Sequence, residues 1–209
     1  ARLGCRVTGF DLVPELLAIA RERAADAMVE VDWVEGDAEQ LPFAPDSFDR
    51  VLSTFGCMFA PDHVRTAAQM LRVCRPGGVI GMCNWTPQGA VGEMFATVAS
   101  VVGSPPGPGT PPPAWGTEEH VRELLGPHAS ELRCERRRVE FAEESPEAYA
   151  DFMLESFGPL LSARAALAER AEELRPALLE LFARWNQADD GTLRYDGEYL
   201  LVVARVQET

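Results

Sequence analysis

The feature that most constrains this chain is the alternation of strand patterns with helix patterns over its first 85 residues. Short apolar runs typical of strands alternate with segments that repeat apolar residues at helical spacing. The expected strands cover residues 5–11, 29–35, 48–53 and 79–85, and the expected helices cover 14–24 and 61–75. Strands joined through helices at this spacing form right-handed crossovers and a largely parallel sheet. The sequence therefore predicts an α/β fold.

Beyond residue 85 the pattern is less regular. Residues 103–113 hold six prolines and three glycines, which is typical of a surface loop. The expected elements are a helix over 91–102, a short helix after Thr117, a strand over 131–141, a helix from Pro146, a helical segment over 161–185 interrupted at Pro176, and a strand over 199–206. We therefore divide the chain into a cofactor-binding part, 1–85, a helical and proline-rich substrate or lid region, 86–193, and a final strand, 194–209.

The composition disfavours several classes of partner. A net charge of -14 and a pI of about 4.6 repel phosphate backbones and anionic lipids, so neither nucleic acid nor a membrane is expected, and Arg136, Arg137 and Arg138 are interpreted as solvated surface. The five cysteines lack C-x-x-C spacing, so no metal site and no disulfide framework is predicted. They are interpreted as small buried residues of a protein in a reducing cytoplasm. No apolar run reaches the roughly 18 residues that a membrane-spanning helix needs, so a soluble protein is expected.

Two acidic residues follow strand patterns. Asp11 ends the first expected strand, where a carboxylate can accept two hydrogen bonds from the hydroxyls of a ribose; it can equally interact with the dipole of the next helix. Asp37 follows Gly36 at the end of the second strand and precedes an apolar Leu-Pro-Phe. Its carboxylate can accept from an adenine amine while the next backbone N–H donates to a ring nitrogen, and the alternative is a turn with a local side-chain hydrogen bond.

Together with the Pro-Gly-Gly reversal at residues 76–78, these motifs resemble the successive motifs of class I S-adenosylmethionine-dependent methyltransferases, of the methyltransferase type 11 kind. The resemblance covers residues 5–85. It implies a Rossmann-like, doubly wound, mostly parallel sheet with an antiparallel C-terminal strand. It also implies that the cofactor is S-adenosylmethionine, with S-adenosylhomocysteine as product, and that the acceptor is a small molecule. The cofactor-binding residues that it implies are Asp11, Leu12, Asp37, Ala38, Ser53, Thr54 and Phe55.

The departure from the family pattern lies at the beginning of the chain. The family's first strand and its glycine-rich loop belong just before Ala1, and no later segment of this sequence replaces them. The first strand is therefore expected to be missing from between the strands that end at Asp11 and Ser53. We expect an unrecorded upstream segment to supply it, and without that segment weak cofactor binding and an inactive, unstable protein.

Methyl transfer from a sulfonium needs no covalent enzyme intermediate, so a general base is optional. His63, which follows the strand ending at Ser53, is the candidate for that catalytic role, and the alternative is a surface residue in the first turn of a helix. Aromatic residues could line an apolar acceptor pocket. The candidates are Phe55, Phe59, Trp85, Trp115, Tyr149, Phe152 and Phe157.

Two other functions fit parts of the pattern. A nicotinamide-dependent oxidoreductase also places an acidic residue after its second strand, but it needs neither the Gly36-Asp37-Ala38 loop nor the Pro-Gly-Gly reversal. A degenerate Rossmann-like scaffold could instead serve as a binding or dimerisation module without catalysis. A homodimer is left open by the sequence.

Overall fold

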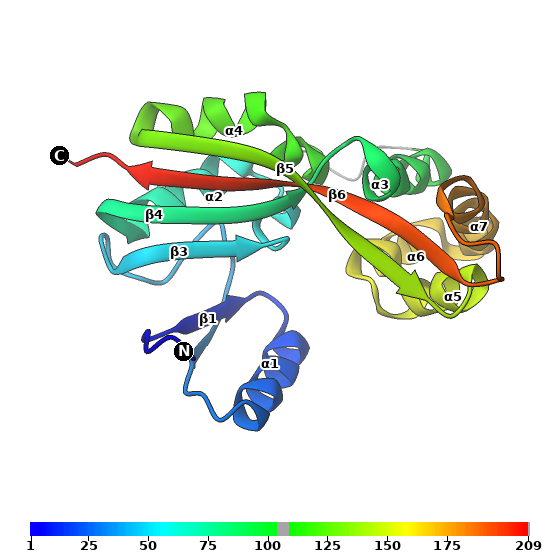
Figure 1. The fold of residues 1–209 in the computed structure, drawn as a ribbon, viewed down its shortest axis with the longest axis horizontal. Coiled ribbons are helices and arrows are strands. Elements are labelled where there is room, and N and C mark those ends of the chain that lie inside the picture. Colours follow the sequence, from blue (N-terminus) through cyan, green and yellow to red (C-terminus); the bar gives the residue numbers. More distant parts are fainter. Residues whose placement is uncertain (104–108, 209) are drawn as a thin grey trace.

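The computed structural model describes residues 1–103 and 109–208. Its strands are β1 (Thr8–Asp11), β2 (Asp32–Glu35), β3 (Phe48–Thr54), β4 (Cys74–Trp85), β5 (Ala129–Glu143) and β6 (Leu193–Val206). Its α-helices are α1 (Pro14–Asp26), α2 (His63–Val73), α3 (Gly89–Val102), α4 (Glu118–Leu125), α5 (Pro146–Ser156), α6 (Gly158–Leu167) and α7 (Leu174–Trp185), and short 3-10 helices include η1 (Cys57–Phe59), η2 (Pro112–Gly116) and η4 (Ala168–Glu173). Figure 1 shows how these elements are arranged.

The strands form two sheets. β1 pairs in parallel with β2, and a second sheet has the order β3-β4-β6-β5, with β3 parallel to β4 and with β6 antiparallel to both of its neighbours. β1 and β3 are not paired, and they face each other across the place where the sequence predicts a further strand (Figure 1). The α/β fold with parallel strands first and an antiparallel strand at the C-terminus is confirmed.

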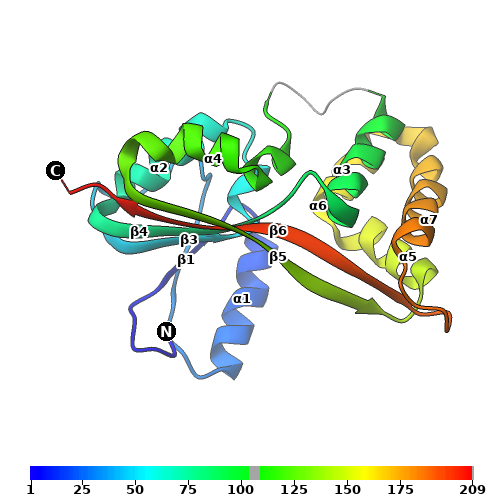
Figure 2. The same cartoon turned by 45° about the horizontal axis from the view of Figure 1, so that its top comes forward.

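Helices lie on both sides of the sheet. Figure 2 shows α2 and α4 on one side and α1, beside β1, on the other. On the α2 and α4 side, alternate residues of β4 and β6 are buried, among them Ile80, Met82 and Val202, and they form one core with Met58 and Trp115. The period-2 alternation of buried residues follows from the pleat of the strand.

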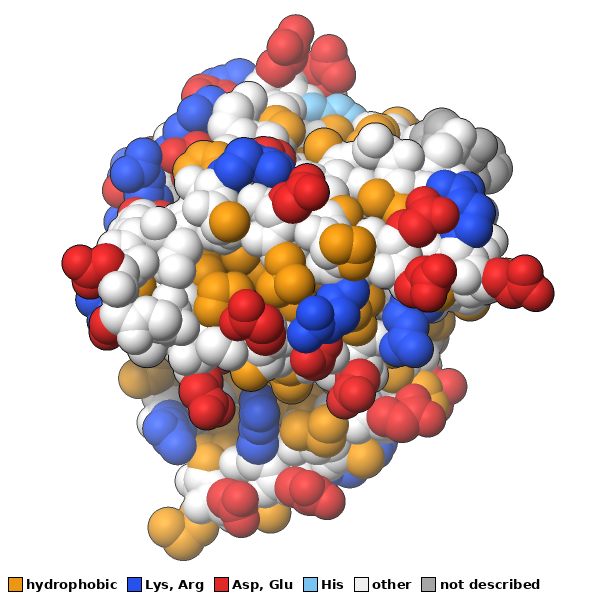
Figure 3. All heavy atoms as spheres, turned by 90° about the vertical axis from the view of Figure 1, so that its right-hand side faces the viewer, with side chains coloured by type: hydrophobic (Ala, Val, Ile, Leu, Met, Phe, Trp, Pro, Cys, Tyr) orange, Lys and Arg blue, Asp and Glu red, His pale blue; other side chains and the backbone are white. Residues whose placement is uncertain are grey.

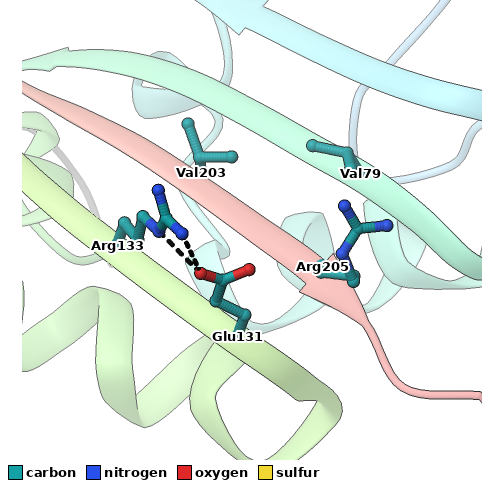
Figure 4. Close-up of a pocket in the computed structure, with 5 residues that line it drawn as sticks. All are labelled: Val79, Glu131, Arg133, Val203 and Arg205. Atoms are coloured by element: carbon teal, nitrogen blue, oxygen red, sulfur yellow. Dashed lines mark hydrogen bonds and ion pairs between the residues drawn. The ribbon is translucent and has the colours of Figure 1, made fainter.

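The opposite face of the four-stranded sheet is more open. Leu52 is 76% exposed on this face and Val203 is 41% exposed. A hollow of about 240 Å³ lies here between Val79, Glu131, Arg133, Val203 and Arg205 (Figure 4). The guanidinium of Arg133 is paired with Glu131 across it.

A second core lies under the helices at the other end of the molecule. α3, α5, α6 and α7 pack around residues such as Leu160, Leu178 and Phe182, and around Tyr195 at the beginning of β6. β6 between Leu193 and Gly197 pairs only with β5, so a two-stranded ribbon extends from the sheet into this helical unit. On the face that this end presents, hydrophobic side chains gather between arginine and acidic side chains (Figure 3).

Two expectations need correction. The helical segment over 161–185 breaks at residues 168–173, where Ala168 has a φ of +50°, and not at Pro176. Pro176 is the third residue of α7, where a missing N–H costs no helical hydrogen bond. Cys57 and Cys74 are buried as expected, but Cys5 is exposed, and Cys83 and Cys134 are half-buried. Of the expected loop over 103–113, residues 104–108 lie outside the described residues.

Within the described ranges, no helix is long and apolar enough to cross a membrane. Over the same ranges, no cluster of three or more His, Cys, Asp or Glu side chains is arranged to hold a metal ion.

Candidate functional site

Asp11 and Asp37 lie at the carboxyl ends of two adjacent parallel strands. Asp11 pairs in register with Glu35, and the backbone N–H of Gly36 donates to the Asp11 carbonyl oxygen at 3.0 Å. Oδ1 of each carboxylate accepts from the backbone N–H two residues later, Val13 for Asp11 (2.9 Å) and Glu39 for Asp37 (2.8 Å). The structure therefore brings both side chains to one edge of the sheet, and it leaves the second oxygen of each without a protein partner among the described residues.

The other groups at this edge suit an adenosine. The backbone N–H of Ala38 has no acceptor in the described part of the chain, whereas its neighbours Glu39 and Gln40 both donate to Asp37. Leu12, which follows Asp11, is 64% exposed, so an apolar surface lies beside the carboxylates. Carboxylate acceptors, an unused amide donor and an apolar side chain are the groups that bind ribose hydroxyls, an adenine edge and an adenine face.

The segment that carries Asp37 is held against α2. The guanidinium of Arg72 donates to the carbonyl oxygens of Leu41 (2.8 Å) and Phe43 (2.6 Å), and Gln69 accepts from the Leu41 N–H (3.2 Å). Glu39 reaches the backbone N–H of Asp62, immediately before α2, at 2.7 Å. These supporting contacts join residues 23 to 31 positions apart, and no local pattern in the sequence indicates them.

Ser53, Thr54 and Phe55 lie at the carboxyl end of β3. Ser53 Oγ accepts from the Cys57 N–H at 2.9 Å, and the Phe55 N–H donates to the Cys83 carbonyl at 2.8 Å. The first bond fixes the turn into η1, and the second continues the pairing with β4 beyond Thr54. The three residues therefore share the edge of the fold at which β1 and β2 end, although β3 belongs to the other sheet.

Phe55 adopts a backbone conformation that is unusual for its residue type. Its φ of +58° lies in the left-handed region, which costs a bulky residue about 1–3 kcal/mol. Its ring stacks on Trp85 with centroids 3.9 Å apart and planes inclined by 15°. Such strain persists where surrounding contacts hold it, and it is concentrated at functional sites.

His63 lies in the first turn of α2, as expected, but it is buried, with 2% of its surface exposed. Its Nδ1 lies 2.9 Å from Nε2 of His120, and its ring lies beside Trp115. Burial, and next the neighbouring His120, lower the pKa of His63 to about 4. Burial also lowers the pKa of His120.

Three buried polar atoms have no hydrogen-bond partner among the described residues. They are Nε2 of His63 and Nε1 of Trp115, at the histidine pair, and Nδ2 of Asn84, in β4. No pattern in the sequence predicts the contact between His63 and His120, because the two residues belong to different helices 57 positions apart. A catalytic role for His63 stays a prediction.

Two hollows of the surface lie away from these strand ends. The larger one, of about 330 Å³, is lined by residues such as Asp46, Arg72, Pro76 and Val206. These include the amino end of β4 and the carboxyl end of β6, so this hollow lies at the edge opposite to Ser53. The smaller one, described above, lies on the open sheet face.

Comparison with known proteins agrees with the fold. A family model described as a methyltransferase domain matches residues 1–82. An uncharacterized protein of Mycobacterium tuberculosis (strain H37Rv) is 38% identical over 208 residues, which cover 98% of this chain and 74% of that protein. The demethylmenaquinone methyltransferase of Deinococcus radiodurans is 35% identical over 91 residues, which cover 43% of this chain and 38% of that protein.

Among solved structures, that of a candidate methyltransferase from Bacillus halodurans superposes with a TM-score of 0.60 at 20% identity, covering 98% of this chain and 84% of that one. At this identity the likeness shows a shared fold. The chain belongs to the class I S-adenosylmethionine-dependent methyltransferases. It spans about three quarters of the length of its mycobacterial relative.

Proposed function

We propose that this protein binds S-adenosylmethionine at the carboxyl ends of β1, β2 and β3 and transfers its methyl group to a small-molecule acceptor. The observation that carries the proposal is the position of Asp11 and Asp37 at the ends of adjacent parallel strands, each with one carboxylate oxygen that has no partner among the described residues.

Each proposed contact follows from the chemistry of the residue. The Asp11 carboxylate accepts from the ribose hydroxyls, and Asp37 accepts from the exocyclic adenine amine while the Ala38 N–H donates to a ring nitrogen. Leu12 packs against the base. Ser53, Thr54 and Phe55 then face the methionine portion. When bound, the cofactor supplies an electrophilic methyl group, and the protein's task is to hold the acceptor in line with it.

His63 is the proposed general base. Its side chain is buried, which is unusual for a residue that has to reach a proton of the acceptor. A base must come within hydrogen-bond reach of the proton that it removes, so this role requires the ring to become accessible when the acceptor binds. The role predicts that His63→Gln lowers kcat and removes the acid limb of its pH profile. An unchanged profile would exclude it.

The partners and the cellular location are proposed together with the function, from the net charge and the cysteines. The acidic surface disfavours nucleic acid and anionic membranes, and five free cysteines suit a reducing cytoplasm. A homodimer is compatible with the fold.

The decisive experiment is calorimetric titration of the protein, expressed from its natural start codon, with S-adenosylhomocysteine and with NAD. Binding of S-adenosylhomocysteine alone is expected. Asp11→Asn and Asp37→Asn should each weaken it about tenfold or more, since a hydrogen bond to a charged group contributes about 1.5–3 kcal/mol. Asp26→Asn, at the far end of α1, is the matched control and should change nothing. Binding of NAD would favour an oxidoreductase, and binding of neither ligand would favour a module without catalysis.

A further inference from the structure

An aromatic face lies where the sheet meets the helical unit. Its rings come from the end of β3, from η1, from the end of β4, from α3, from the link between α5 and α6, and from β6. The residues are Phe55, Phe59, Trp85, Phe95, Phe157 and Tyr199. Trp85 and Phe95 pack against both hydrophobic cores, so the face follows the boundary between them.

The inner part of the face is rigid. Phe55 stacks on Trp85, and Tyr199 meets Phe55 edge-on, with centroids 5.7 Å apart and planes inclined by 79°. Stacked and edge-on pairs are the favoured arrangements of aromatic rings. Together with the backbone bond from Phe55 to Cys83, they hold the strained Phe55 in place.

The outer part of the face is a triangle of three rings. The centroid distances are 6.1 Å from Phe59 to Phe95, 6.3 Å from Phe59 to Phe157 and 6.3 Å from Phe95 to Phe157. Phe59 is 39% exposed, and the other two are only half-buried. Apolar surface is less favourable in water than in a covered contact, so a complex in which a molecule covers these rings is stabilised.

The face adjoins the proposed methyl-transfer site. Phe55 directly follows Ser53 and Thr54, and Phe59 comes four residues later, at the end of η1. β3 and β4 both run toward the helical unit (Figure 1). A molecule lying against the outer rings therefore sits at the strand end where the methionine portion is proposed to lie.

We propose that the methyl acceptor is a planar, uncharged aromatic molecule whose ring lies against Phe59, Phe95 and Phe157. The proposal rests on the proposed function. A flat ring offers the stacked and edge-on contacts that phenylalanine rings favour. A charged acceptor would lose hydration against these apolar rings without a compensating partner.

The first test measures binding with four probes that share one fused two-ring framework. The probes are 2-naphthol, its saturated counterpart 2-decalol, 2-naphthoate and 2-naphthylmethylammonium, each titrated into the protein with and without saturating S-adenosylhomocysteine. 2-Naphthol is expected to bind at least about fivefold more tightly than each of the others, which corresponds to about 1 kcal/mol. Tighter binding of either charged probe, or equal binding of 2-decalol, would overturn the proposal.

The second test assigns the binding to the outer rings. Phe59→Ala should weaken 2-naphthol binding about fivefold or more, Phe59→Leu should abolish the preference over 2-decalol, and Phe59→Tyr should stay within about twofold of the parent protein. Phe152→Ala is the matched control, because Phe152 is 62% exposed and contacts Tyr149 rather than the face. Thermal melting of each variant shows whether it is folded.

The two proposals fail in different ways. If S-adenosylhomocysteine binds but 2-naphthol does not, or if a folded Phe59→Ala variant binds it as the parent does, the acceptor class is wrong and the methyltransferase function stands. If 2-naphthol binds and depends on Phe59 while S-adenosylhomocysteine does not bind, the aromatic site stands and the methyl-transfer function is wrong.

Discussion

Nδ1 of His63 and Nε2 of His120 lie 2.9 Å apart, and this contact joins the first turn of α2 to α4. A hydrogen bond between two imidazoles needs one N–H and one lone pair, so at least one of the two rings is neutral. The contact is buried beside Trp115. Protonation of both rings would place two positive charges in this core.

We predict that the histidine pair lowers the free energy of unfolding in acid. The pKa of His63 is lowered to about 4 in the folded protein and is about 6.5 in the unfolded chain, so the unfolded state binds the additional proton. The contribution of His63 is therefore fully present above pH 6.5 and is lost as the pH falls toward 4, by up to about 3 kcal/mol. In urea unfolding at several pH values, His63→Leu should flatten the pH dependence in this window. A slope equal to that of the parent protein would contradict the prediction.

We predict that no side chain can be added at Gly116 without moving the segment that carries Trp115. A Cβ at this position would overlap the carbonyl group of Trp85, so Gly116→Ala must displace η2 from the end of β4. We expect a loss of at least about 2 kcal/mol in the free energy of unfolding. Gly126→Ala is the control, because a Cβ there meets nothing within 4 Å and its backbone is helical. That variant should be as stable as the parent or more stable by about 0.5 kcal/mol.

At position 55 we expect the glycine variant to be more stable than the alanine variant, which is the reverse of the usual order of these two residues. Phe55→Ala loses the stack on Trp85 and keeps the left-handed backbone, whereas Phe55→Gly loses the stack but adopts φ +58° without strain. The glycine variant should therefore unfold with a free energy about 1 kcal/mol higher than that of the alanine variant. Chemical denaturation of the two variants measures the difference, and a less stable glycine variant would refute the strain.

We predict that Arg72, in α2, raises the affinity of the protein for the cofactor. Arg72→Ala removes two hydrogen bonds to the segment after Asp37 and should weaken S-adenosylhomocysteine binding by about threefold or more, since the segment must be ordered on binding. Arg75→Ala is the control, because it removes an exposed pair with Asp49 and a hydrogen bond to the Pro76 carbonyl, neither of which involves the segment after Asp37. An exposed ion pair contributes about 0–1 kcal/mol. Equal affinities of the two variants would show that Arg72 does not order the site.

The alternation of strands and helices could be predicted because period-2 and period-3.6 patterns record which face of an element is buried. This alternation predicts most of the elements between Thr8 and Val206. The break between α6 and α7, however, is not at Pro176, where the sequence predicts it. Proline is compatible with the first turn of a helix, so its presence does not mark the end of one. The lengths of β5 and β6 were underestimated because their outer parts pair with each other beyond the sheet.

For the candidate site, local sequence sufficed to place the residues at the strand ends. The structure places Asp11 and Asp37 at adjacent strand ends, as predicted, because parallel strands end at one edge. The contacts of His63 with His120, and of Arg72 with Leu41 and Phe43, depend on how α2 packs against distant segments. Such long-range contacts leave no periodic signal in the sequence.

The ribbon of β5 and β6 also bears on how the helical unit is joined to the sheet. Residues 193–197 pair only with residues 139–143, whereas residues 199–205 lie between β4 and β5. Amide protons of residues 193–197 should therefore exchange with solvent faster than those of residues 199–205, because fewer neighbouring strands hold them.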